Sequence, residues 1–297
     1  MLKETDLICY QENRFNHHSK LNFFLKKHST KEGTWGTLKI LKGDIELVFL
    51  NGNEEELWRH RLSAKHSLTI PPACWHKIMP LSAEFEFTLS FSCKPQRFFS
   101  KKYGLGEVHK DLFYVWQTYL SELKKLNILD VGCGSGRNLL YFALLGHSLT
   151  GLDANESALN TIQQIANHEN FAEVQTKRVD LNEPLNLPDE AFNLIFSTVS
   201  IQFLQPERIP SLLLELQKAT AEQGFHVLVF PIRSETFSLP ASFTFLPEKE
   251  ALYHYYQDQG WSILEYKESV GQLHKKDELG KPIQGLFGLI VAQKIHR

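Results

Sequence analysis

Residues 128–136 read ILDVGCGSG, and this stretch decides the fold. A run of leucine and β-branched residues ends in Asp130, and three glycines follow at alternate positions before a helix is expected to begin. Glycine lets the backbone approach a ligand and adopt a positive φ, and a helix N-terminus attracts polar or anionic groups. The segment therefore predicts a strand, a ligand-binding turn and a helix.

The spacing of these glycines argues against a dinucleotide cofactor. In the GxGxxG fingerprint the third glycine lets the helix pack closely on the strand. Here Gly136 comes one residue early, and Arg137 occupies the position of that packing glycine. We therefore do not expect NAD or FAD.

Polar residues end the next three predicted strands. Asp153 lies 17–21 residues beyond the glycines, where one carboxylate suits two ribose hydroxyls. Asp180 and Leu181 end the third strand, where the acid can face an adenine amino group and the leucine its ring. Ser197 and Thr198 end the fourth. Each aspartate alone could equally be a helix N-cap or a turn residue, but their convergence at one sheet edge predicts a nucleoside site.

Strands and helices alternate along the C-terminal two-thirds of the chain. Strands are predicted at 127–131, 148–152, 174–179, 192–198, 225–230, 262–266 and 286–293, and helices at 108–125, 137–145, 157–167, 207–220 and 248–259. This alternation is typical of a mainly parallel sheet with helices on both faces. The fold class expected here is α/β and Rossmann-like, with a seven-stranded sheet.

Residues 1–95 follow a different pattern. Short strands are predicted at 37–41, 45–50, 67–70 and 84–92, with turn residues between them. Such spacing is typical of an antiparallel sandwich or small barrel. We therefore predict two domains, an all-β domain over 1–95 and an α/β domain over 100–297 that folds and binds its cofactor alone.

Composition argues against several classes of function. The formal net charge of −2 gives no general attraction to nucleic acid. No signal peptide begins the chain, and no apolar run is long enough to span a membrane. The four cysteines show no CxxC spacing, so we expect reduced thiols and a cytoplasmic protein.

The motifs together resemble a known family. ILDVGCGSG looks like the cofactor turn of a class I S-adenosylmethionine methyltransferase, and further segments resemble the tellurite-resistance methyltransferases, the TehB family. Those segments are KYGLGEVH (102–109), GLDAN (151–155), VDLN (179–182), FSTVSIQFL (196–204) and VGQLHKKDELGKPI (270–283). The resemblance covers about residues 100–295, and the N-terminal part resembles the cupin-like domain of the family's long forms.

The resemblance implies S-adenosylmethionine as the cofactor and a set of residues around it. The implied cofactor-binding residues are Tyr103, His109, Asp130, Gly132, Gly134, Arg137, Asn138, Asp153, Ala154, Asp180, Leu181, Ser197 and Thr198. His109 could equally be an ordinary residue at a helix N-terminus.

The resemblance also implies an acceptor site at His274 and Lys275, with Arg137 as a further catalytic cation. We expect the segment around His274 to be a loop between the last two strands, although it could also be a solvated charge run. Lys275 and Pro282 stand where short family members have arginines. Positive charge is retained, but bidentate guanidinium contact is not.

His28, Glu32 and His76 are candidate metal ligands in the cupin-like part. Imidazole and carboxylate suit Fe, Mn, Ni or Zn. The usual HxH pair is missing, because Ser29 and Thr30 follow His28. We therefore predict a metal-free domain that helps to shape the enzyme or to form a homodimer.

These features predict methyl transfer to a small oxyanion, tellurite or selenite. An in-line displacement needs its nucleophile held about 3–3.5 Å from the methyl group. Tellurite attacks through a lone pair and needs no general base, but it does need cations to hold its oxygens. Two alternatives stay open: methylation of a thiol or another small metabolite, and a cofactor-binding regulator without catalysis.

Overall fold

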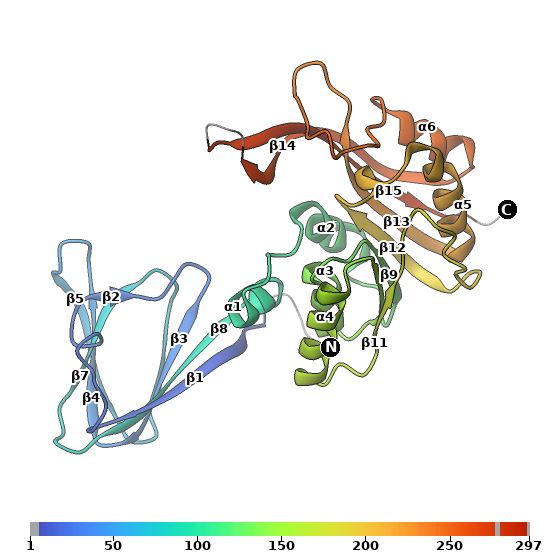
Figure 1. Cartoon of the computed structure of the whole chain (residues 1–297). Helices are drawn as coiled ribbons and strands as arrows, with labels where there is room; N and C mark the ends of the chain where they lie inside the picture. The colour runs from blue at the N-terminus through green and yellow to red at the C-terminus, as the bar shows by residue number, and fades with distance from the viewer. Residues whose placement is uncertain (1–5, 277–279, 296–297) are drawn as a thin grey trace. The chain divides into compact units, whose positions relative to one another are not determined.

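Residues 6–276 and 280–295 are described by the computed structural model, with the side chains of 274–276 outside that description. The chain divides into two compact units, one ending at Gly106 and the other beginning at Glu107 (Figure 1). This boundary lies beyond the predicted one at residue 95. The reason is that η1 (Pro95–Arg97) and α1 (Phe98–Tyr103) continue from the last N-terminal strand, and α1 packs against the first strand of that unit.

The N-terminal unit is built of strands up to Cys93, as predicted. One four-stranded antiparallel sheet has the order β1–β8–β3–β6 and the other the order β2–β7–β4–β5. Their bounds are β1 (Ile8–Asn16), β2 (His28–Ser29), β3 (Trp35–Lys42), β4 (Asp44–Leu50), β5 (Glu56–Ser63), β6 (Ser67–Ile70), β7 (Trp75–Pro80) and β8 (Glu86–Cys93). Alternate side chains such as Leu38, Phe87 and Ile78 are fully buried and form the core.

The C-terminal unit is built on a seven-stranded sheet with the order β11–β10–β9–β12–β13–β15–β14. The strands are β9 (Asn127–Val131), β10 (Ser148–Asp153), β11 (Val174–Arg178), β12 (Phe192–Thr198), β13 (Thr220–Ile232), β14 (Ser262–Lys276) and β15 (Pro282–Gln293). Only β15 runs antiparallel to its neighbours. The predicted Rossmann-like class is confirmed, and the strand order reverses beside β9, where such sheets bind ligands.

Helices cover both faces of this sheet. Figure 1 shows α2, α3 and α4 on one side and α5 and α6 on the other. Their bounds are α2 (Lys110–Val115), α3 (Arg137–Leu144), α4 (Glu156–His168), α5 (Ile209–Ala219) and α6 (Ala251–Asp258), with short turns η2 (Trp116–Leu120), η3 (Ile201–Phe203) and η4 (Pro206–Arg208). Leu129 and Val131 of β9 share a core with Leu212 of α5 and Tyr256 of α6. No helix in the described ranges is long and apolar enough to cross a membrane.

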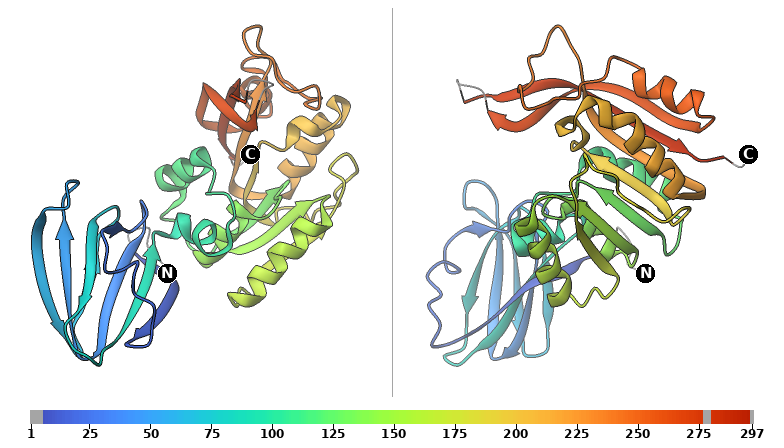
Figure 2. Two further views of the ribbon diagram at one scale, coloured as in Figure 1. Left: turned by 60° about the vertical axis from the view of Figure 1, so that its left-hand side comes forward. Right: turned by 45° about the vertical axis from the view of Figure 1, so that its right-hand side comes forward.

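Two predicted elements differ from the observed ones. The helix expected over 108–125 ends at Leu120, after a π-helical turn, and Lys125 at φ +49° turns the chain into β9. The segment expected to be a loop near residue 270 is instead the end of β14, because Val270 and Gly271 pair with Leu286 and Gly285 of β15. The right-hand view of Figure 2 shows this long hairpin. Since β14 runs parallel to β13, its carboxyl end lies at the same sheet edge as the glycine turn.

Candidate functional site

The turn after β9 has a backbone conformation and close contacts that require glycine at Gly132 and Gly136. The Gly132 N–H donates to the carbonyl of Leu152 at 2.8 Å, which fastens the turn to β10. Gly132 and Gly136 have φ of +79° and +81°. A Cβ on Gly132 would lie 2.4 Å from the Cβ of Ser200, and one on Gly136 would lie 2.6 Å from Cγ1 of Ile162. The backbone is therefore held close to the site without side chains in between.

The start of α3 is open to a ligand. Gly136 is the N-cap residue, and no side chain caps the first N–H groups of the helix. A Cβ on Gly134 would meet no atom within 4 Å, so the space over the turn is empty of protein atoms in the described structure. Uncapped N–H groups and the helix dipole favour a polar or anionic ligand group here.

Asp130 presents a buried carboxyl group beside the turn. It is 1% exposed, and its Oδ2 has no hydrogen-bond partner among the described residues. Burial raises the pKa of this carboxyl well above its usual range, and the charge of Asp153 adds to the rise, while Arg137 opposes it. A buried acceptor without a partner is costly unless a ligand supplies a donor, and a cationic donor would favour the ionised form.

Asp153 holds the glycine turn in place. Its Oδ2 accepts a hydrogen bond from the Gly134 N–H at 2.8 Å, and its Oδ1 accepts one from Asn155 at 2.8 Å. A carboxylate has about four lone-pair sites, so two remain for a ligand. Ala154 follows as an exposed residue before α4.

Asp180 and Leu181 follow β11 with opposite exposure. Asp180 is exposed, and its Oδ1 accepts hydrogen bonds from the backbone and side chain of Asn182 at 2.9 and 3.1 Å. Leu181 is 8% exposed, and its Cδ1 lies 3.9 Å from the position of a Cβ on Gly132. Leu181 therefore lies near the glycine turn, and the adenine contacts of both residues stay a prediction.

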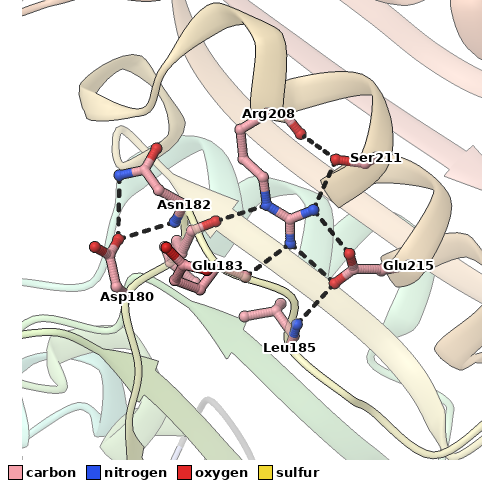
Figure 3. Close-up of polar contacts among 8 residues, drawn as sticks. Asp180, Asn182, Glu183, Leu185, Arg208, Ser211 and Glu215 are labelled. Atoms are coloured by element: carbon pink, nitrogen blue, oxygen red, sulfur yellow. Dashed lines mark hydrogen bonds and ion pairs between the residues drawn. The ribbon is translucent and has the colours of Figure 1, made fainter.

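Arg208, which sequence reasoning missed, holds this segment in place (Figure 3). Its guanidinium donates to the carbonyls of Leu181 and Glu183, both at 3.0 Å, and to both oxygens of Glu215 at 2.7 and 2.9 Å. Glu215 in turn accepts from the Leu185 N–H at 2.9 Å. In the sequence, an arginine seven residues before a glutamate gives no sign of this role.

Asn138 connects the end of β12 with the segment before α2. Its side-chain amide donates to Oγ1 of Thr198 and accepts from the His109 N–H, both at 2.9 Å. His109 is the N-cap of α2, and it also borders the pocket described next. Its role in cofactor binding stays a prediction. Ser197 is buried and its hydroxyl is hydrogen-bonded to that of Ser200.

A pocket of about 130 Å³ opens beside Arg137. Its walls include His109, Val199 after β12, and Gln272 and Phe287 of the hairpin. Arg137 makes no hydrogen bond or ion pair with any described residue, and burial lowers the pKa of its guanidinium while Asp130 opposes that change. An arginine nonetheless keeps its charge in proteins. The pocket therefore contains an unpaired, half-buried cation.

Other predicted site residues lie elsewhere or outside the described part. Tyr103 belongs to the N-terminal unit, where its ring stacks on Phe99 at 6.1 Å between centroids. His274 and Lys275 have their backbone in β14, next to the pocket residue Leu273, but their side chains lie outside the described residues. Pro282 pairs with Lys276 in the hairpin.

Of the three candidate metal ligands in the N-terminal unit, two histidines lie together and the glutamate is exposed to solvent. His28 and His76 face each other across β2 and β7, with ring centroids 4.2 Å apart. Glu32 is exposed, and its backbone carbonyl accepts from Arg97 and Lys101. No group of three His, Cys, Asp or Glu side chains in the described ranges is arranged as metal ligands are.

The C-terminal site fits S-adenosylmethionine. The unpaired Oδ2 of Asp130 suits an ammonium group, the open turn at Gly134 suits the polar methionine end, and Asp153 has acceptor capacity for a ribose. Leu181 offers an apolar surface for a base.

Two family descriptions match the chain, "Tellurite resistance protein TehB" over residues 91–291 and "TehB-like domain" over residues 12–89. The chain belongs to the TehB family. A probable S-adenosyl-L-methionine-dependent methyltransferase TehB of Haemophilus influenzae is 35% identical over 293 residues, which are 98% of this chain and 99% of that protein. Hemagglutinin 1 of Eikenella corrodens is 31% identical over 227 residues, 76% of this chain and 72% of that one.

A solved structure supports the same assignment. The crystal structure of TehB from Haemophilus influenzae superposes with a TM-score of 0.90 at 33% identity, covering 98% of this chain and 100% of that one. This TehB-family chain is therefore an S-adenosylmethionine-dependent methyltransferase, and the predicted family, enzyme class and cofactor are confirmed. The roles of individual residues remain predictions that the geometry above makes specific.

Proposed function

We propose that this enzyme transfers a methyl group to tellurite, and to selenite as a second acceptor, giving less toxic methylated species. The observation that carries the proposal is Arg137, a half-buried cation at the pocket wall that makes no ion pair with any described residue. A guanidinium binds oxyanions through paired N–H donors, and it does so more strongly where water is partly excluded. The family description, tellurite resistance, supports the same acceptor.

The chemistry asks little of the protein beyond placement. S-Adenosylmethionine supplies an electrophilic sulfonium methyl group, the tellurium lone pair forms the new C–Te bond, and the C–S electron pair returns to sulfur. Tellurite carries no proton that must leave, so the site needs no general base. Arg137 holds the oxyanion, and the backbone of the α3 N-terminus adds partial positive charge beside it.

His274 and Lys275 are proposed as further contacts to the oxyanion. Their support is their position in β14 directly after Leu273, which borders the pocket. His109 also lines the pocket, and its backbone N–H donates to the Asn138 amide oxygen. Cations from two elements would then meet one small anion, which favours a compact substrate over an extended one.

The test is steady-state turnover with tellurite in Arg137→Gln, Arg137→Lys and a control, Arg61→Gln, an exposed arginine of the N-terminal unit. Arg137→Gln should lower kcat/KM for tellurite by about 10–150-fold, the loss expected when a charge-assisted hydrogen bond of roughly 1.5–3 kcal/mol is removed. Arg137→Lys should recover part of the activity because the charge remains. The control should match the parent.

Equal tellurite turnover in Arg137→Gln and the parent would contradict this acceptor site. Faster turnover of a thiol than of either oxyanion would favour the metabolite alternative instead.

We also propose a cytoplasmic location, supported by four cysteines that form no disulfide. The homodimer remains a prediction, which sedimentation velocity can test.

A further inference from the structure

The N-terminal unit contains a cavity with no assigned function. Its volume is about 410 Å³, within the roughly 300–1,000 Å³ of small-molecule sites. Aromatic and aliphatic side chains form much of its wall, among them Phe24, Phe91, Ile70 and Leu89. All of its lining residues belong to the N-terminal unit.

Two buried histidines of this wall have fixed tautomers. His28 is 8% exposed and His76 2% exposed. The Nδ1 of His28 lies 2.9 Å from the carbonyl oxygen of Lys26, and the Nδ1 of His76 lies 2.9 Å from that of Cys74. A carbonyl oxygen can only accept, so each Nδ1 carries the proton and each Nε2 carries a lone pair.

Neither Nε2 has a hydrogen-bond partner among the described residues, although both rings line the cavity. Burial of the two rings disfavours a charged imidazole, in agreement with the Nδ1–H tautomer that the two carbonyl contacts require. The cavity therefore presents two hydrogen-bond acceptors whose donors must come from outside the protein. The two histidines occupy directly paired strand positions, which keeps their rings close together.

Several other polar groups of the wall already have partners within the protein. The hydroxyl of Thr30 donates to the carbonyl of Pro71 at 2.8 Å, and that of Thr34 is hydrogen-bonded to the hydroxyl of Tyr10 at 3.4 Å. Lys101 donates to the carbonyl of Glu32 at 3.3 Å. The two histidines, together with Gln11, Ser29 and Lys31, are therefore the polar partners that a ligand would find in this wall.

These features determine which kinds of ligand the cavity can bind. Two acceptor nitrogens favour a molecule with O–H or N–H donors, and they disfavour an anionic group at the histidines themselves, where it would need a protonated, buried imidazole. A transition metal would need further protein ligands, and no group of three His, Cys, Asp or Glu side chains in the described ranges could supply them. The aromatic wall favours an apolar or aromatic body.

We propose that this cavity binds a small uncharged molecule with an aromatic or similar apolar body, whose hydroxyl or N–H groups donate to Nε2 of His28 and His76. The site is separate from the methyl-transfer site and its occupancy does not depend on the methyl acceptor. It gives the N-terminal unit a ligand-sensing or ligand-holding role of its own.

The test uses the full chain and two matched probes in calorimetric titrations. Catechol has two donors, and 1,2-dimethoxybenzene has the same ring without them. We expect catechol to bind at one site per chain and the ether to bind at least about tenfold more weakly, the loss expected of about one hydrogen bond. His28→Phe and His76→Phe should weaken catechol by a similar factor, while His18→Phe, an exposed control in the same unit, should not.

The ether also reports on the cavity itself. If the phenylalanine variants bind the ether as the parent does, their loss of catechol comes from the missing acceptors and not from a collapsed pocket. Equal binding of both probes to the parent would overturn the proposal, and so would an absence of catechol binding up to its solubility limit. Stoichiometric Zn²⁺ binding that disappears in His76→Phe would show a metal site instead.

Discussion

Replacing Asp153 with alanine removes a side chain that accepts two hydrogen bonds in the cofactor site. In the parent, Oδ2 accepts from the Gly134 N–H and Oδ1 from the Asn155 N–H, each at 2.8 Å. The remaining lone pairs are those expected to receive two ribose hydroxyls. The substitution therefore removes ligand contacts and releases the turn that shapes the site.

The expected loss follows from these contacts. A hydrogen bond to a charged group contributes roughly 1.5–3 kcal/mol, so two ribose bonds amount to roughly 3–6 kcal/mol, or about 10²–10⁴-fold in Kd. Asp153→Asn keeps one acceptor oxygen and should lose less. The fold should survive, because the Gly132 N–H still donates to the carbonyl of Leu152.

Calorimetric titration with S-adenosylmethionine measures the effect, and circular dichroism checks the fold. Asp189→Ala, an exposed acid in the loop before β12, is the matched control and should bind as the parent does. An Asp153→Ala protein that is folded and binds the cofactor with parental affinity would refute the assignment of this carboxylate to the ribose.

Four further predictions follow from other contacts. Arg208→Leu should destabilise the C-terminal unit by roughly 3–5 kcal/mol and weaken cofactor binding, because it leaves Glu215 and two carbonyls unpaired; denaturant unfolding and titration measure the two effects. Val199, a β-branched residue at φ +54° in the pocket wall, stores strain, so Val199→Gly should raise stability by about 1 kcal/mol while raising KM for the acceptor. A chain beginning near residue 100 should bind S-adenosylmethionine with parental affinity, and a folded fragment without binding would show that both units are needed. Burial lowers the pKa of His76 to about 4, so the unfolded chain binds the extra proton below about pH 6.5 and stability should fall between ~6.5 and ~4; His76→Gln should flatten this dependence in thermal unfolding.

The fold could be predicted because its signals are local. The turn after Asp130 combines a buried strand, three glycines and a helix start within nine residues of sequence, 128–136. Alternating apolar periods marked the other strands and helices of the sheet. The acids at strand ends could be placed for the same reason, since parallel strands bring their carboxyl ends to one edge.

The parts that escaped prediction depend on contacts between distant residues. Asn138 meets Thr198 across 60 positions, and Arg208 meets Leu181 across 27, so neither pairing leaves a periodic pattern. The end of β14 was predicted as a loop because its polar and charged residues resemble one, yet it forms ladder bonds with β15. His28 and His76 are candidate metal ligands by sequence, and the pairing of β2 with β7 brings the two rings together without a third ligand among the described residues.

The most direct measurement of the central claim is the fate of a labelled methyl group. The purified full chain is incubated with methyl-labelled S-adenosylmethionine and either tellurite, selenite or a thiol, and the products are separated and identified by mass spectrometry. We expect label on tellurium in stoichiometric proportion to S-adenosylhomocysteine, with turnover reduced in Arg137→Gln. Label transferred only to the thiol would contradict oxyanion methylation, and tight cofactor binding with no labelled product from any acceptor would contradict catalysis itself.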